Sequence, residues 1–426
     1  MPLRSAFALL LAVAVWGCAS ARDAYEGGME REVAGDYPAA ADAYVTALER
    51  DRTLQNVPGR LAVAGREAVR VHLGRAAGQA PVDAARSYRA AAALVRRAAA
   101  VGVRVDHPAS LDADLRAAES AAVDALADDA RLRLDAFDYP AALDVLSQAR
   151  TFGPDAGQAD ALDGIALDAY DGWARADLAS GRFRTALAHT EAALDLGGSP
   201  DVYDALRLDV LDAGAVVGAV LPVEAADDVP RWFTRDLFDA LSEDALAGPP
   251  SPFVVLADPA EVRRWERRRG SRSPVELSDS PRRLGDAARD LGADVGVVVY
   301  LADVRDVRRV GEPEDQTARL RRGSGSATYT RRRVDLTVTA QADVIAVDAG
   351  GQPVCERAVE RRVTERYDRS SFNGDLATLD LSRAERRAFS DDADSDARDR
   401  ALAELRDDLA DALADEVVRC LDSLVP

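Results

Sequence analysis

The sequence contains no lysine, because all 54 of its basic residues are arginine. This absence excludes a P-loop lysine, a Schiff-base lysine and a Ser–Lys dyad. Only three histidines occur, His72, His107 and His189, and they lie far apart with no H-E-x-x-H spacing, which argues against a zinc site. No G-x-S-x-G motif is present either. We therefore expect no catalytic residues, no cofactor and no metal ligands.

Basic residues are also outnumbered, since 74 acidic residues give the 426-residue chain a formal charge of −20. Such a charge disfavours nucleic acid as a partner. The acidic, lysine-free composition fits either a high-salt habitat or a GC-rich genome. With 48% hydrophobic and 30% charged residues, the chain is typical of folded proteins and long enough for two or three domains.

Long apolar runs are scarce, and the first one predicts an export signal. Arg4 precedes the apolar run 7–15, which is too short to span a membrane and suits a signal-peptide core. The run ends in Val-Trp-Gly followed by Cys18, which resembles the lipobox of bacterial lipoproteins. The resemblance implies a signal peptide at 1–17, an acylated Cys18 and a tether at 18–28. An ordinary signal peptide, cut near residues 19–21, is the alternative.

The location implied by the lipobox and the residues after it is the outer membrane. Residues 19 and 20 are Ala and Ser rather than Asp, and the sorting rule of well-studied lipoproteins then implies retention at the outer membrane, on its periplasmic face.

Cysteine is otherwise rare, and with Cys18 acylated only Cys355 and Cys420 remain. In an oxidising compartment this pair predicts either a disulfide or two buried free thiols.

Residues 29–213 are predicted to form helix pairs. Gly35 ends one helix and Tyr37 opens the next, in which Ala40, Tyr44, Ala47 and Leu48 make one stripe at helical spacing. This segment resembles the second half of a tetratricopeptide repeat. Two partial copies carry Tyr139, Ala142, Leu143, Leu146 and Ala149, and then Gly181, Phe183, Ala186, Leu187, Ala193 and Leu194.

The first two copies lie 102 residues apart, three times the 34-residue period, and Phe137 stands where the first copy has Gly. Repeats of this kind stack around a continuous core and offer a surface to a partner. The alternative is a generic alanine-rich helical bundle.

Residues 214–426 are predicted to form an α/β domain. Apolar runs at 216–223, 253–256 and 295–301 read as buried strands, with helices from Pro230, near 258–269 and at 284–291 between them. Residues 334–344 and 355–367 alternate as a hairpin whose connection is 348–353. The last element is an amphipathic helix with its apolar side chains at Leu402, Leu405, Leu409, Leu413, Val417, Cys420 and Leu424.

The strand openings, Val-Leu-Pro-Val at 220–223 and Leu-Gly-Ala-Asp-Val at 291–295, resemble a periplasmic domain shared by three envelope groups. These are the curli secretion-channel lipoprotein, the lipoprotein activators of penicillin-binding proteins, and the N-terminal domain of the Tol-Pal β-propeller protein. The resemblance implies a partner-binding domain without an active site. Segments 302–333 and 368–397 are rich in Arg and Asp, which argues against membrane-inserted hairpins.

One stretch departs from the acidic composition. Residues 261–333 hold 18 Arg against 12 Asp and Glu. The runs Arg267, Arg268, Arg269 and Arg331, Arg332, Arg333 make a candidate patch for an anionic partner, because arginine forks suit phosphate and carboxylate. A solvated face, or docking of the basic stretch on the acidic helical half, is the alternative.

The predicted fold class is α+β multidomain, with helical repeats followed by a mixed α/β sheet domain and an amphipathic helix. We expect a non-catalytic, lipid-anchored periplasmic scaffold or activator that binds envelope proteins, with membrane attachment through its N-terminal lipid. An oligomeric outer-membrane secretion channel and a cell-wall hydrolase are the competing hypotheses. The oligomeric state and the identity of the partners stay open.

Overall fold

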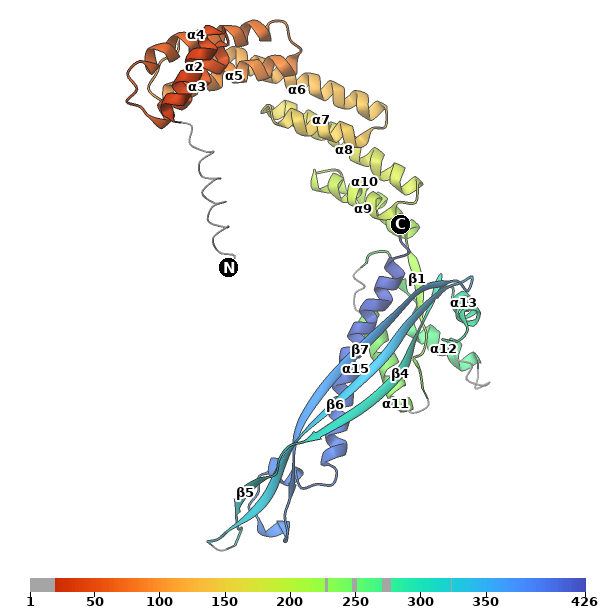
Figure 1. Ribbon diagram of the computed structural model, residues 1–426. Helices are drawn as coiled ribbons and strands as arrows, with labels where there is room; N and C mark the ends of the chain where they lie inside the picture. Colours follow the sequence, from red (N-terminus) through yellow and green to blue (C-terminus); the bar gives the residue numbers. More distant parts are fainter. Residues whose placement is uncertain (1–19, 227–228, 247–250, 270–276, 323) are drawn as a thin grey trace, which may run out of the picture. The chain divides into compact units, whose positions relative to one another are not determined.

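The computed structural model describes residues 20–426, except 227–228, 247–250, 270–276 and 323. Cys18 and the predicted signal peptide lie outside these residues. The chain is an α+β multidomain protein, with a helical N-terminal region followed by a mixed sheet and a C-terminal helix (Figure 1). It divides into two compact units: the described residues up to Ala176 together with Ala188–Asp204, and Asp177–Leu187 together with Ala205–Pro426.

Helices account for nearly all of the described chain between residues 21 and 213. They are α2 (Ala21–Val33), α3 (Tyr37–Arg50), α4 (Val57–Ala76), α5 (Pro81–Ala100), α6 (Leu111–Asp135), α7 (Tyr139–Arg150), α8 (Ala156–Ala179), α9 (Phe183–Asp195) and α10 (Pro200–Ala213).

The turns that open α3, α7 and α9 share one backbone geometry. Gly35, Phe137 and Gly181 have φ of +77°, +58° and +71°, the left-handed conformation that ends a helix. In each turn the next residue donates its N–H to the carbonyl five residues earlier, at 2.9, 2.9 and 2.8 Å. The helix pairs expected from the sequence are therefore confirmed, including the one in which Phe replaces Gly.

The same three pairs bury small residues at matching positions. In the second helix, alanines at 40 and 47, 142 and 149, and 186 and 193 are completely buried. The first helix places a buried Gly28, Ala130 or Ala174 twelve residues before the first of these alanines. Small side chains here let the two helices of a pair lie close together, and the expected stripe of the first copy is buried as predicted.

The sheet of the second unit runs in the order β3-β1-β4-β6-β5, with β2 on β4 and β7 on β6. Its strands are β1 (Val216–Val220), β2 (Glu224–Ala225), β3 (Val254–Leu256), β4 (Val295–Val310), β5 (Glu314–Arg319), β6 (Ser326–Asp348) and β7 (Pro353–Ser371). Strands β1, β2, β3 and β4 pair in parallel, whereas β4, β5, β6 and β7 pair antiparallel. Strand β7 is an edge in the described part of the chain.

The helices of this unit are α11 (Arg231–Leu246), α12 (Pro259–Arg269), α13 (Pro281–Asp290), α14 (Arg383–Arg387) and α15 (Ala393–Asp422), with a 3-10 turn η1 at Leu376–Thr378. Helix α15 lies along β6 and β7 and against α11 (Figure 1). Its apolar side chains pack with Leu336, Val338, Ala340, Ala342 and Val344 on one face of β6, as the alternation predicts. Val334, on the same face, is also buried.

Two details differ from the sequence-based expectation. Strands β4 and β6 extend well beyond the apolar segments 295–301 and 334–344. The sequence did not predict the outer extensions, because they are rich in charged residues that hide the strand alternation. Leu424 is 39% exposed and follows the end of α15, whereas Val425 is buried.

Candidate anion-binding site

The run Arg331–Arg333 lies on β6, and the strand divides it between two faces. Arg332 points to the face that also carries Val334, since alternate side chains share a face. Arg331 and Arg333 point to the opposite face, where Arg331 pairs with Glu314 at 3.2 Å and with Asp368 at 3.6 Å. The predicted patch is thus not one surface, and Arg332 belongs to a different cluster.

Arginines from three strands make that cluster. Arg332 is the direct cross-strand neighbour of Arg369 on β7, and Arg308 comes from β4 on the other side of β6. Like charges directly opposite one another destabilise a sheet. The arrangement therefore calls for an anion on this face.

Asp394, in the first turn of α15, supplies part of the compensating charge. Its carboxylate accepts hydrogen bonds from Arg369 at 2.6 Å, from Arg308 at 3.1 Å and from the hydroxyl of Tyr367 at 2.8 Å. Burial, followed by the hydrogen bond to Asp394, raises the pKa of Tyr367 to about 12. Tyr367 therefore stays protonated at neutral pH and donates to the carboxylate.

These groups surround a pocket of about 530 Å³. Its walls also include Val310, Thr330, Val334, Ser370 and Ser371. Three arginines and one aspartate give the pocket a formal charge of +2. Within the described chain Arg332 forms no ion pair, so its guanidinium is the free cation of the site.

Sequence reasoning singled out Arg332 and missed Arg308, Arg369, Tyr367 and Asp394. These residues are separated by up to 86 positions, and only the register of β4, β6 and β7 brings them together. The available signal was the strand period itself, which places Arg332 on the apolar face of β6, next after the buried Val334.

The other predicted run, Arg267–Arg269, lies at the end of α12. Arg268 borders a cavity of about 560 Å³ between α12 and α13, beside Trp265 and Arg283. The indole N–H of Trp265 donates to Asp290 at 3.4 Å. Arg267 is exposed, and the side chain of Arg269 lies outside the described part of the structure.

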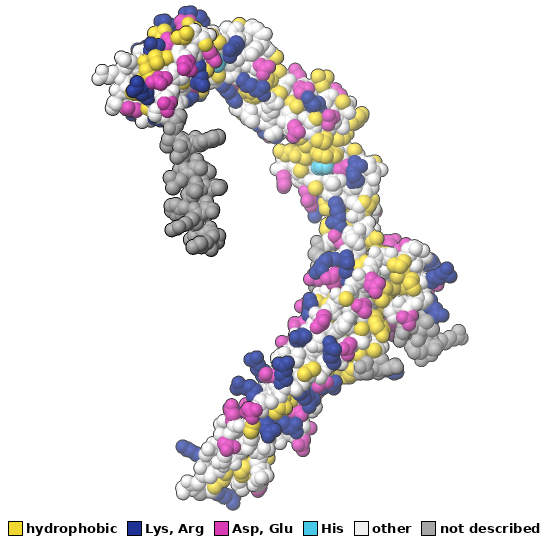
Figure 2. Space-filling view, in the orientation of Figure 1, with side chains coloured by type: hydrophobic (Ala, Val, Ile, Leu, Met, Phe, Trp, Pro, Cys, Tyr) yellow, Lys and Arg dark blue, Asp and Glu magenta, His cyan; other side chains and the backbone are white. Residues whose placement is uncertain are grey.

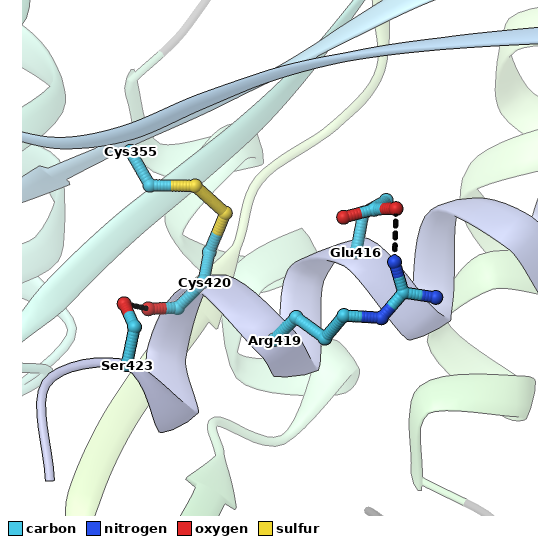
Figure 3. The surroundings of a disulfide bond; sticks show 5 residues. All are labelled: Cys355, Glu416, Arg419, Cys420 and Ser423. Carbon is cyan, nitrogen blue, oxygen red and sulfur yellow. Dashed lines mark hydrogen bonds and ion pairs between the residues drawn. A yellow bond between two sulfur atoms is a disulfide. The ribbon is translucent and has the colours of Figure 1, made fainter. Parts of the chain in front are cut away.

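Cys355 and Cys420 form a disulfide in the structure, between β7 and the last turns of α15 (Figure 3). Their Cα atoms are 5.8 Å apart, and Cys420 is only 2% exposed. Next to the bridge, the hydroxyl of Ser423 donates to the carbonyl of Cys420 at 2.7 Å. The bridge fastens the edge strand to the helix that covers it.

A second surface feature lies in the helical unit, around the turn between α6 and α7. The side chain of Phe137 is 76% exposed, and its backbone is left-handed, with a φ of +58°. Its ring lies edge-on to the ring of Tyr139, with 6.4 Å between the ring centroids. The ring of Tyr139 stacks on that of Trp173 at a centroid distance of 6.5 Å, and the ring of Trp173 stacks on that of His189 at 3.8 Å. Figure 2 shows hydrophobic side chains gathered on the surface near α8. The cluster stands out in a chain with only 5% aromatic residues.

Two further findings bear on chemistry and on membranes. Among the described residues no three His, Cys, Asp or Glu side chains come together in a way that suits a metal ion. None of the helices in the described ranges has both the length and the apolar character that crossing a bilayer requires.

No protein family matches the chain, and no curated protein matches it. Among solved structures, the chain is similar to the hypothetical protein CT253 from Chlamydia trachomatis, at 14% sequence identity and a TM-score of 0.21. The similarity covers 48% of this chain and 99% of that one.

Proposed function

We propose that the chain is a lipid-anchored scaffold of the bacterial envelope, held on the periplasmic face of the outer membrane by an acylated Cys18. In this proposal the helical unit is a tetratricopeptide-like array that binds a protein partner. The matching turns and buried alanines of the pairs α2–α3 and α6–α7 support that assignment, because stacked pairs of this kind leave an extended surface for binding.

The observation that carries the proposal is the exposed ring of Phe137. A left-handed backbone costs a non-glycine residue on the order of 1–2 kcal/mol. The two equivalent turns avoid this cost with Gly35 and Gly181. An aromatic side chain held at such a position, with its ring edge-on to Tyr139, is typical of a residue retained for contact with a partner.

The sheet unit is proposed as a second partner-binding domain, related to the domain of the curli channel lipoprotein, the penicillin-binding-protein activators and the Tol-Pal propeller protein. A disulfide between Cys355 and Cys420 is in keeping with an oxidising periplasm. The arginine pocket gives this domain a binding function of its own and requires no catalysis.

Anchoring is tested by mass spectrometry of the mature protein and by membrane fractionation. The expected N-terminus is Cys18 with fatty-acyl groups, and a Cys18→Ala variant is expected to leave the membrane fraction. A mature N-terminus beyond residue 19 without acylation would overturn the anchor while leaving the partner-binding surface untouched.

Partner binding is tested by placing a photo-crosslinking phenylalanine analogue at position 137. Val33, which is 89% exposed near the end of α2, is the matched control position. We expect a discrete crosslinked species from position 137 and none from position 33. Equal crosslinking from both positions would show that the aromatic cluster is not a preferred contact.

A further inference from the structure

The arginine pocket of the sheet unit has spare binding capacity. Arg369 and Arg308 already share Asp394, whereas Arg332 donates to no carboxylate in the described chain. A guanidinium carries five N–H donors. Thr330 and Ser371, whose side chains share the face of Arg332, line the same space. The site therefore presents several donors and a charge that its own residues do not neutralise.

We propose that this pocket binds a phosphate group, either as the free ion or as a phosphomonoester. A phosphomonoester carries about −1.5 to −2 charges at pH 7 and three acceptor oxygens. Its charge matches the formal +2 of the pocket, whereas a single carboxylate leaves one positive charge unpaired. Its tetrahedral oxygens also suit donors that converge from two strands, with Arg332 and Thr330 on β6 and Arg369 and Ser371 on β7.

The neighbouring charges do not cancel this excess. Asp306 lies 3.6 Å from Arg308, but it also lies 3.8 Å from Arg398. The charges of Asp306 and Arg398 cancel, so these two residues together add no net charge to the pocket. Asp368 belongs to the opposite face of β7, where it pairs with Arg331. Asp394 is the one carboxylate that lines the pocket among the described residues, and it competes with the phosphate for Arg369 and Arg308.

The test is calorimetric titration of the full chain with inorganic phosphate at low ionic strength, with acetate as the monovalent comparison. Saturable binding of phosphate at one site is expected, with acetate at least ten-fold weaker. R332Q should weaken phosphate binding ten-fold or more, since a hydrogen bond to a charged group is worth at least that factor. R333Q removes the same charge from the opposite face of β6 and should change the affinity less than two-fold.

A variant with the opposite sign distinguishes a binding pocket from a purely structural ion network. D394N removes the competing carboxylate and frees two guanidinium groups, so phosphate should bind several-fold more tightly. If D394N fails to fold, as judged by circular dichroism, the phosphate affinities of R332Q and R333Q decide between a binding pocket and a structural ion network. The proposal is overturned if phosphate shows no saturable binding, if acetate binds as tightly, or if R333Q weakens binding as much as R332Q.

The source of the phosphate is settled in a second arm. Vesicles of phosphatidylcholine with and without phosphatidic acid, whose headgroup is a phosphomonoester, are sedimented with the full chain. Retention that depends on both phosphatidic acid and Arg332 assigns the site to a membrane headgroup. Binding of inorganic phosphate without such retention assigns it to a soluble phosphate.

Discussion

The ring of Tyr44 lies directly over Gly28, so closely that a Cβ atom at residue 28 would stand 2.5 Å from a ring carbon. Tyr44 is fully buried, and its hydroxyl donates to Glu32 at 2.5 Å, which in turn accepts from Arg60 at 2.9 Å. The ring is therefore held from three helices, α2, α3 and α4, and cannot move aside without breaking these contacts.

The first prediction concerns Gly28→Ala. We expect the substitution to destabilise the helical unit by about 1–3 kcal/mol, because it inserts a methyl group into a packed contact. The neighbouring Gly27 has open space around its Cβ position, so Gly27→Ala should instead stabilise the helix by up to about 1 kcal/mol. Urea unfolding followed by circular dichroism measures both, and equal effects at the two positions would contradict the contact.

The second prediction concerns the turn at Phe137. Replacing this residue by glycine relieves its left-handed backbone, so F137G should raise the stability of the helical unit by about 1 kcal/mol. Gly35→Ala, at the equivalent turn, should lower it by a similar amount. Thermal unfolding of the two variants is the measurement. A less stable F137G protein would show that the ring is retained for packing within the chain rather than for a partner.

The third prediction is a loss of stability in alkaline solution. Burial, together with the hydrogen bond to Glu32, raises the pKa of Tyr44 to about 12. Burial, together with the hydrogen bond to Asp394, raises the pKa of Tyr367 to about 12 as well. Since both folded-state values lie above the ordinary 10, the contribution of each phenol is complete below pH 10 and declines toward pH 12. In unfolding curves, Y44F should flatten this decline for the helical unit and Y367F for the sheet unit. Unchanged pH profiles would contradict the assignment.

The fourth prediction concerns the bridge between Cys355 and Cys420. Alkylation of the denatured, unreduced protein should label neither of these cysteines. Because the bridge closes a 65-residue separation, its loss in C355S/C420S should destabilise the sheet unit by up to about 4 kcal/mol on the chain-entropy account. Labelling of both thiols in protein prepared under oxidising conditions would show that the native chain keeps them free.

Elements with a buried face were predictable from the sequence. The stripe around Ala40 and Tyr44 and the alternation of β6 both follow from periodic burial, and both are confirmed. The outer parts of β4 and β6 were not predictable, because charged side chains dominate there and the small apolar cluster around Tyr329 is completed by residues distant in sequence. Their pairing is set by continuation of the ladder from the apolar segments.

The candidate pocket shows the same limit. From the sequence, the three adjacent arginines 331–333 are predicted to form one patch. In a strand, however, the side chain of Arg332 lies on the face opposite to those of Arg331 and Arg333. Arg308 and Arg369 reach Arg332 only through the pairing of three strands, which no local spacing records.

The free margin of β7 limits how another molecule can engage the sheet. Its exposed side chains carry charges of both signs, at Glu356, Arg357, Glu360, Arg361, Arg362 and Arg366. Charged side chains along an open margin discourage the backbone of a second chain from extending the ladder, and with it runaway assembly into fibres. Recognition on this side of the protein is therefore left to side chains, so a ligand has to match charges and cannot simply add a strand.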